Sequence, residues 1–324
     1  MYSGPLTIDS HTVSDGQGNN DGKLNAGESV TLNLTLTNDS DLALDGATMV
    51  LSTESEYVTI TDGSATLPHF DAGQTRTINN MFAFSLSADA PSKRNVQFLA
   101  ETYVGGEMIG AFRISVMVYG HILKFTEVTV LNDNNGNGSL EPGETGNLHV
   151  TISNVGNDPA TSVVGALSST YPYLSINSNN KSFGSINVDE QASANYSVTL
   201  SNSAPQSYAI SFGLDLVDAA QKHTNVNFEL WRKSITLASN PAGAGTLTGA
   251  GYYGQGQSCT ITAEPNNGYA FVSWTLNDEV VSYLPTYTFE VTGEANYVAN
   301  FKAFNNSIFV GDGSTTNYYL PRYS

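Results

Sequence analysis

An internal duplication accounts for most of this sequence. Residues 22–28 (GKLNAGE) are matched 116 positions later by residues 138–144 (GSLEPGE), and the match continues through the segments that follow. A two-residue deletion later shortens the offset to 114. A period this long corresponds to a whole domain, because solenoid repeats have periods of about 20–50 residues. We therefore expect residues 1–120 and 121–233 to form two copies of one domain.

Each copy contains short segments in which apolar and polar residues alternate. Residues 30–36 (VTLNLTL) and 148–152 (LHVTI) show this period of two, which is typical of strands with one buried face. About seven such strands in ~115 residues are the signature of an immunoglobulin-like sandwich. Thr, Val, Ser, Gly and Tyr are abundant and helix-forming runs are nearly absent. The sequence therefore predicts an all-β fold with two tandem immunoglobulin-like β-sandwiches.

The acidic balance of the chain excludes several kinds of partner. The formal net charge is −18, so nucleic acid and anionic membrane surfaces should repel the protein. No apolar run is long enough to span a membrane, and the first residues do not open a signal peptide. We expect no nucleic-acid binding and no membrane insertion. If the protein is exported, its signal has been removed or belongs to a longer precursor.

A twelve-residue stretch in the second copy fits the sequence template of a calcium-binding loop. Residues 133–144 (DNNGNGSLEPGE) match this template at every specified position. Calcium takes six to eight oxygen ligands, which such a loop supplies from side chains at positions 1, 3, 5 and 12 and a carbonyl at position 7. The sequence therefore predicts a Ca²⁺ site formed by Asp133, Asn135, Asn137, the Ser139 carbonyl and Glu144.

The neighbours of these ligands partly support the same interpretation. Gly138 at position 6 permits a sharp turn because it lacks a Cβ, and Leu140 at position 8 is expected to point into a core. The carboxylates of Asp133, Glu141 and Glu144 should repel one another without a cation. The flanking segments alternate as strands do, whereas an EF-hand has helices on both sides. The alternative is an Asn/Gly-rich turn that binds nothing.

The first copy carries a weaker version of this loop. Its aligned position 1 is Gln17 rather than Asp, while Asn19, Asp21 and Glu28 occupy positions 3, 5 and 12. Asp15 lies two residues earlier and can supply the missing carboxylate if the chain bends inward. A weaker second metal site at Asp15, Asn19, Asp21 and Glu28 and a plain turn are both consistent with the sequence.

Residues 234–303 do not belong to the duplication and have a motif order of their own. The order comprises residues 240–243 (NPAG), 251–256 (GYYGQG) and 265–274 (PNNGYAFVSW). It resembles the divergent internalin-type B-repeat, a small β-grasp-like module of bacterial surface proteins. The resemblance implies a spacer or adhesion role and no catalytic residues. We expect residues 304–324 to be a linker or the start of a further module.

The two sandwich copies also show a family resemblance. Their shared pattern, Leu-x-Pro/Ala-Gly-Glu followed by Leu-x-Val-Thr-Ile-x-Asn in the second copy, is similar to the β-sandwich modules that follow the catalytic domain of gingipain-type cysteine peptidases and other secreted bacterial peptidases. This resemblance covers about thirty residues per copy. It implies a secreted parent protein and calcium, but it does not make these residues an enzyme.

The residues of the chain give little support to catalysis. Cys259, the only cysteine, shares the face of a predicted strand with Ile261 and Ala263, so we expect it to be a buried apolar residue rather than a nucleophile. The chain has no Gly-x-Ser-x-Gly motif and no phosphate-binding loop. Five histidines lack the spacing of metal ligands: His11, His69, His121, His149 and His223. We therefore expect no enzyme activity in these residues.

Two classes of function remain. The first is a non-catalytic, calcium-stabilised stalk or adhesion segment of an extracellular multidomain protein, secreted or held at the cell surface. Its partners would be other domains of the same polypeptide and a host or cell-surface protein or glycan. The second is a carbohydrate-binding accessory segment of a secreted glycosidase or peptidase. That class would need a planar row of exposed rings, and the candidates are Tyr171, Tyr173, Tyr252 and Tyr253.

Overall fold

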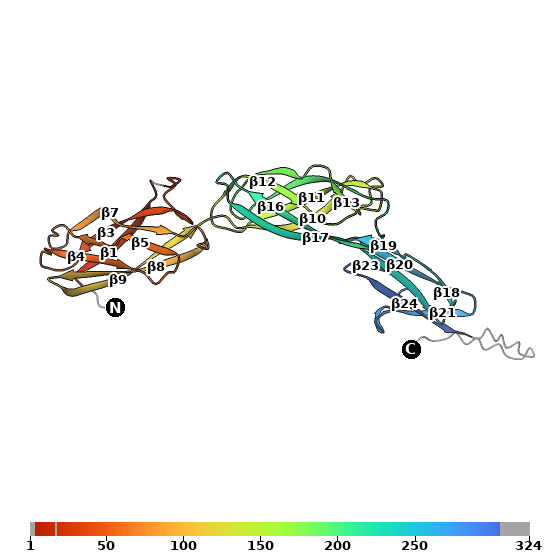
Figure 1. Cartoon of the computed structure of the whole chain (residues 1–324). Helices are drawn as coiled ribbons and strands as arrows, with labels where there is room; N and C mark the ends of the chain where they lie inside the picture. The colour runs from red at the N-terminus through yellow and green to blue at the C-terminus, as the bar shows by residue number, and fades with distance from the viewer. Residues whose placement is uncertain (1–3, 17, 305–324) are drawn as a thin grey trace, which may run out of the picture.

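The computed structural model describes residues 4–16 and 18–304 of the chain. All regular elements in these residues are β-strands, which confirms the predicted all-β class. Three β modules follow one another in a row from the N-terminus to the C-terminus (Figure 1). The predicted linker or further module falls almost entirely on residues 305–324, outside the described residues.

The first module is a sandwich of two sheets. One sheet has the order β1-β3-β7-β5 and the other has the order β2-β9-β8-β4-β6. Its strands are β1 (Leu6–Ser14), β2 (Leu24–Asn25), β3 (Ser29–Asn38), β4 (Ala47–Ser52), β5 (Val58–Asp62), β6 (Ser64–Thr66), β7 (Thr75–Leu86), β8 (Arg94–Val104) and β9 (Glu107–Tyr119). In β3, Val30, Leu32, Leu34 and Leu36 are buried between less buried polar residues, as the alternation predicted.

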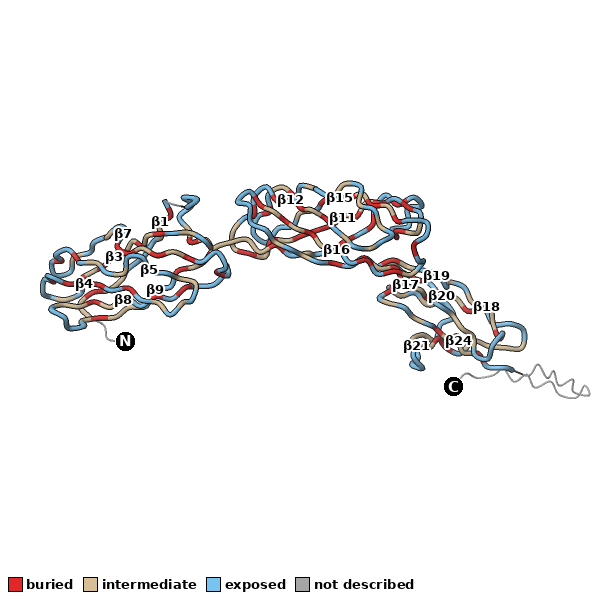
Figure 2. Tube along the Cα trace, in the orientation of Figure 1, coloured by how far each residue is buried: buried red, intermediate tan, exposed pale blue. Residues whose placement is uncertain are grey.

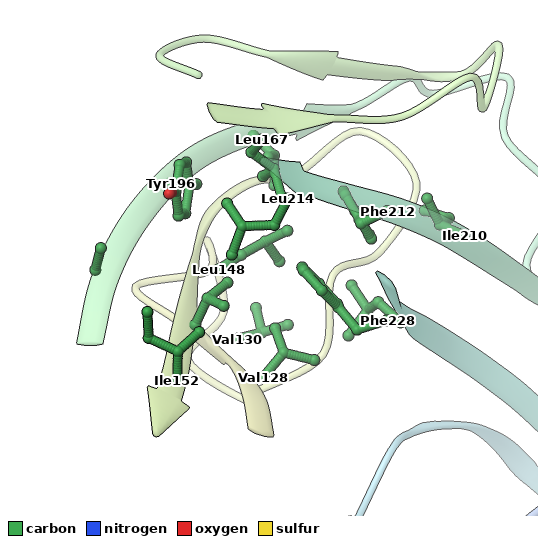
Figure 3. Packing of buried hydrophobic residues seen from close by; sticks show 14 of the residues in the cluster. Val128, Val130, Leu148, Ile152, Leu167, Tyr196, Ile210, Phe212, Leu214 and Phe228 are labelled. Atoms are coloured by element: carbon green, nitrogen blue, oxygen red, sulfur yellow. The ribbon is translucent and has the colours of Figure 1, made fainter. Parts of the chain in front are cut away.

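The second module repeats this sandwich. Its sheets have the orders β10-β11-β15-β13 and β14-β12-β16-β17. The strands are β10 (Leu123–Leu131), β11 (Thr145–Asn154), β12 (Ala160–Ser168), β13 (Leu174–Ile176), β14 (Asn180–Ile186), β15 (Gln191–Leu200), β16 (Tyr208–Val217) and β17 (His223–Asn240). Phe212 and Phe228 stack in the core with ring centroids 5.1 Å apart (Figure 3).

The order of strands in both sandwiches agrees in part with an immunoglobulin domain. The sheet β1-β3-β7-β5 corresponds to strands A, B, E and D, and the run β9-β8-β4 corresponds to G, F and C. One strand departs from that order: β6 follows β5 along the chain but returns to pair with β4. The sandwich architecture is thus observed, and the closer immunoglobulin-like and β-grasp-like descriptions stay predictions.

The third module shares a strand with the second. Strand β17 pairs with β16 in the sandwich, and its later residues pair with β19 and β24 in the third module, so one sheet continues through both. The remaining strands are β18 (Gly245–Thr248), β19 (Gly251–Gly254), β20 (Ser258–Pro265), β21 (Tyr269–Leu276), β22 (Glu279–Ser282), β23 (Thr286–Glu290) and β24 (Ala295–Ala303). A second, three-stranded sheet β18-β20-β23 completes the module.

Each module has its own hydrophobic core. Buried apolar residues of the first, second and third modules fall within residues 6–118, 123–230 and 235–301. Figure 2 shows buried positions alternating with more exposed ones along the strands. Trp274 is fully buried in the third core, and its indole nitrogen donates a hydrogen bond to the Pro285 carbonyl at 3.0 Å. Separate cores leave the joints between modules to be held by strand β17 and by local contacts.

Candidate metal centre

The candidate calcium loop, residues 133–144, connects β10 to β11 and is called the second loop below. These two strands pair directly, and Leu131 lies opposite Asn147 just before the loop. The loop is therefore flanked by strands and not by the helices of an EF-hand. Gly138 adopts a φ of +77°, a conformation that a residue with a Cβ rarely takes. The turn expected at position 6 is present.

The candidate side chains are held by hydrogen bonds from the backbone of the loop. Asp133 Oδ2 accepts from the N–H of Asn137 at 2.8 Å and of Gly138 at 3.2 Å. Asn135 Oδ1 accepts from Asn137 N–H at 2.9 Å, and Asn137 Oδ1 accepts from Ser139 N–H at 2.8 Å. Glu144 Oε2 accepts from the N–H of Glu141 at 2.9 Å. The chain thus curls around its own side-chain oxygens.

This arrangement leaves oxygen atoms free for a cation. Asp133 Oδ1 and Glu144 Oε1 accept no hydrogen bond from the described residues, although both side chains are largely buried. Within residues 4–16 and 18–304, no group of three or more His, Cys, Asp or Glu side chains gathers as a metal site. A cation here would depend on amide and carbonyl oxygens as well, which calcium accepts readily. The residues present fit a calcium ion.

The structure corrects one expectation about charge in this loop. Glu141 was expected to add to the repulsion between Asp133 and Glu144, but it is paired with a cation. Its Oε1 lies 2.6 Å from a terminal guanidinium nitrogen of Arg232, whose side chain is almost completely buried. Arg232 lies 91 residues from Glu141 and no motif connects them, so the sequence offered no signal for this pair.

Glu141 also orients two of the candidate ligands. Its carboxylate accepts a hydrogen bond from Asn135 Nδ2 at 2.9 Å and from Asn137 Nδ2 at 3.3 Å. Because each amide nitrogen faces Glu141, each amide oxygen faces the backbone N–H groups of the loop. Glu141 therefore acts as a positioning residue, because it holds the nitrogens of both Asn amides toward its own carboxylate.

The first loop, residues 15–28, reproduces the same hydrogen bonds. Asp21 N–H donates to Asp15 Oδ2 at 2.9 Å and Gly22 N–H donates to Asp15 Oδ1 at 3.1 Å. Asp21 N–H also donates to Asn19 Oδ1, Lys23 N–H to Asp21 Oδ1 and Asn25 N–H to Glu28 Oε2. Asp15 thus takes the place of Asp133 with two extra residues in between. Gln17, the aligned residue at position 1, lies outside the described residues.

The first loop nevertheless fits a cation less well than the second. Asp15 and Glu28 both use their two oxygens to accept backbone hydrogen bonds, so fewer lone pairs remain. Burial raises the pKa of Asp15, but hydrogen bonds from backbone N–H groups, led by that of Gly22, outweigh it and lower the pKa overall. Backbone N–H groups therefore already stabilise the negative charge of this carboxylate, as a bound metal ion would.

Other residues singled out from the sequence do not form a second site. Cys259 is buried, as predicted, and burial raises the pKa of its thiol. Tyr171 and Tyr173 meet edge to face, with planes inclined at 63°. Tyr252 lies under the guanidinium of Arg232, 5.2 Å from ring centroid to Cζ, and Tyr253 donates its hydroxyl hydrogen bond to the Gly249 carbonyl. These four rings form no planar row.

Comparison with known proteins identifies the third module. Residues 235–305 match the family described as Divergent InlB B-repeat domain, in agreement with the motif order of this segment. B-repeat domains typically occur in surface or secreted bacterial proteins. The chain is therefore a protein of several β domains that includes a B-repeat. No curated protein matches the chain.

Several solved structures are similar to parts of the chain at low identity. One is a protein of unknown function from Porphyromonas gingivalis W83, with 12% identity, a TM-score of 0.24, and 70% of this chain and 99% of that chain covered. Red sea bream transglutaminase shows 11% identity, a TM-score of 0.24 and coverage of 70% and 31%. The native conformation of E. coli alpha-2-macroglobulin shows 10% identity, a TM-score of 0.27 and coverage of 78% and 18%. The chain thus spans less than a third of the last two proteins.

Proposed function

We propose that this chain is a non-catalytic, calcium-stabilised stalk or adhesion segment of a secreted or cell-surface bacterial protein. The observation that carries the proposal is the end-to-end arrangement of three β modules, the last two joined by the shared strand β17 (Figure 1). Modules arranged end to end make the molecule long, as in a stalk, and do not enclose a substrate. The B-repeat supports an extracellular setting, and no helix of the described residues is long and apolar enough to cross a membrane.

Calcium belongs to this proposal because of the second loop. Its ligand set is the two carboxylates of Asp133 and Glu144, the amide oxygens of Asn135 and Asn137, and the Ser139 carbonyl. These are hard oxygen donors, which favour calcium over softer transition metals. In the first loop, Asp15, Asn19, Asp21 and Glu28 would form the weaker site. A bound ion would stabilise the connection between β10 and β11.

Calcium titration calorimetry on residues 1–324 tests the metal. We expect binding heat for the unmodified chain, and loss of the tighter site in Glu144→Gln, which removes the charge of position 12. Glu127→Gln removes an exposed carboxylate from the same module and should leave binding unchanged. An unmodified chain without heat at millimolar calcium would contradict the proposal.

The carbohydrate-binding alternative has weaker support. Stacking on a sugar needs coplanar exposed rings, whereas Tyr171 and Tyr173 are inclined to each other and one face of the Tyr252 ring lies against the Arg232 guanidinium. A gingipain-type peptidase as the parent protein, and a host or cell-surface protein or glycan as the partner, stay predictions of the sequence. Binding of the chain to glycan arrays, abolished by Tyr173→Ala, would favour the alternative.

A further inference from the structure

The second loop is also a contact surface for the B-repeat. Gln257, in the turn between β19 and β20, donates a hydrogen bond from its Nε2 to the carbonyl oxygen of Asn137 at 2.5 Å. Its own Oε1 accepts from Gly254 N–H at 2.7 Å, which fixes the orientation of the amide. Ser139 lies against Gly254, where an added Cβ would approach Ser139 Oγ to 3.1 Å. Positions 5 and 7 of the loop thus contact the next module.

A second set of contacts leads from the ligands to the B-repeat through Arg232. Glu141 accepts from the amides of Asn135 and Asn137 and pairs with Arg232, whose guanidinium lies over the Tyr252 ring. The other terminal nitrogen of Arg232 donates to Gln206 Oε1 at 2.8 Å. These contacts connect the loop amides to a buried cation on strand β17, which the two modules share.

The joint contains a pocket that is partly open to solvent. Its volume is about 220 Å³, and it is lined by Ser139, Leu140, Tyr208, Trp231, Gly254 and other residues. Ser139 Oγ is buried there without a hydrogen-bond partner among the described residues. Apolar packing alone therefore does not fix the angle between the two modules, and the polar contacts of the loop contribute to it.

The first loop occupies the corresponding place at the other joint. Lys23 at position 7, which matches Ser139, forms an ion pair with Asp158 of the second sandwich. Asn25, which matches Glu141, donates from Nδ2 to the carbonyl of Tyr119 at the end of β9. The duplicated loop therefore contacts the following module at both joints through position 7, which is Lys23 in the first loop and Ser139 in the second.

We propose that the second loop is a calcium-controlled joint, in which an ion bound by the loop restrains the orientation of the B-repeat relative to the second sandwich. This inference depends on the calcium site proposed above. An ion that fixes the oxygens of Asn135 and Asn137 also fixes the Asn137 carbonyl that receives Gln257 and the amide groups that hold Glu141. By linkage, contacts that calcium strengthens must in turn strengthen the binding of calcium.

The test uses residues 1–324 with Gln257→Ala, a change in the B-repeat outside the loop. We expect the Kd of the second loop for calcium to rise roughly fivefold or more, which is the usual range for such coupling. Gly254→Ala, which pushes against Ser139, should act in the same direction. Asn267→Ala removes an exposed amide from another turn of the B-repeat and should leave the Kd unchanged.

Distances between spin labels give a second readout. Labels at Glu127→Cys and Thr286→Cys, both exposed, in a Cys259→Ala background should give a narrower distance distribution in calcium than in EDTA. Gln257→Ala should lose much of that narrowing. If calcium binds, but Gln257→Ala leaves the Kd unchanged and calcium does not narrow the distance distribution, the proposal of a calcium-controlled joint is refuted and the calcium site stands. If no calcium binds, both proposals are overturned.

Discussion

The hydroxyl of Tyr208 donates a hydrogen bond to the carbonyl oxygen of Leu140 at 2.6 Å, inside the second sandwich. Leu140 is position 8 of the candidate calcium loop and is fully buried, as the sequence predicted. Tyr208 begins strand β16, in the sheet opposite the one that carries the loop. The bond therefore connects the loop to both layers of the sandwich, so the loop and the core should be coupled in stability.

Replacement of Tyr208 by Phe tests this coupling. The substitution keeps the ring and leaves the Leu140 carbonyl buried without its donor, which should cost about 1–3 kcal/mol of unfolding free energy. Urea denaturation of residues 1–324 measures the loss. Tyr57→Phe, which removes a hydroxyl for which no hydrogen bond is seen among the described residues, is the control and should change stability little. Equal stability of Tyr208→Phe and the unmodified chain would contradict the coupling.

Arg232→Met should destabilise the joint between the second sandwich and the B-repeat. Met keeps much of the apolar stem, but it leaves Glu141 without its cation and Gln206 without a donor. Glu141 is partly exposed, so we expect a loss of roughly 2 kcal/mol, less than for a fully buried pair. A double-mutant cycle with Glu141→Gln isolates the pair, and additive effects of the two changes would contradict an interaction.

Cys259 should react slowly with iodoacetamide in the native protein at neutral pH. Its side chain is fully buried, and burial raises the pKa of the thiol, so little reactive thiolate reaches the reagent. Labelling in urea should be fast, which serves as the control for reagent quality. Mass spectrometry follows both reactions, and fast native labelling would reopen the question of a catalytic thiol.

The sequence predicted the elements with strong local patterns. Alternation in residues 30–36 and 148–152 identified strands, and the loop motif correctly placed Leu140 in a core and a left-handed residue at Gly138. The joint could not be predicted in this way. The contacts of Glu141 with Arg232 and of Asn137 with Gln257 join residues 91 and 120 positions apart, and no periodicity records which modules meet.

The first loop shows a second limit of the alignment. A fixed offset of 116 places Gln17 at position 1, whereas Asp15 makes the equivalent hydrogen bonds. The backbone absorbs two extra residues because what the loop requires is a carboxylate near the N–H groups of Asp21 and Gly22. Register inferred from sequence is therefore least reliable within turns, where no strand ladder fixes it.

Acidification should destabilise the second sandwich through His121. Burial lowers the pKa of His121 below 6.5, and Lys222 lowers it further, while Asp218 and Asp158 oppose this shift. The folded state thus binds this proton less readily than the unfolded state does. The stability that neutral His121 contributes to the folded state is fully present above pH 6.5, and it is lost as the pH falls from 6.5 through the lowered pKa.

Thermal melting at pH 7.5 and pH 5.0 measures this effect. His121→Gln should reduce the loss of melting temperature on acidification. His69→Gln is an informative comparison, because hydrogen bonds to Asp45 and Asp71 raise the pKa of His69. The stability that protonated His69 contributes is therefore present below pH 6.5 and is lost as the pH rises through the raised pKa. If His121→Gln and the unmodified chain lose the same stability between the two pH values, the assignment to His121 is wrong.

Calcium should raise the melting temperature of the second sandwich. The carboxylates of Asp133 and Glu144, the first and last residues of the loop between β10 and β11, are both largely buried, and a cation between them would remove their repulsion. Binding to the folded state alone stabilises by about 2.7 kcal/mol at a hundredfold excess over Kd. For a module of this size, each kcal/mol corresponds to roughly 2–8 °C. The calorimetric melting temperature of residues 1–324 should therefore be several degrees higher in millimolar calcium than in EDTA.

Magnesium should raise the melting temperature less than calcium does, because it requires octahedral geometry and loses water reluctantly. The melting temperature of Glu144→Gln should not respond to calcium. Identical curves in calcium and EDTA would identify the loop as a turn without a metal.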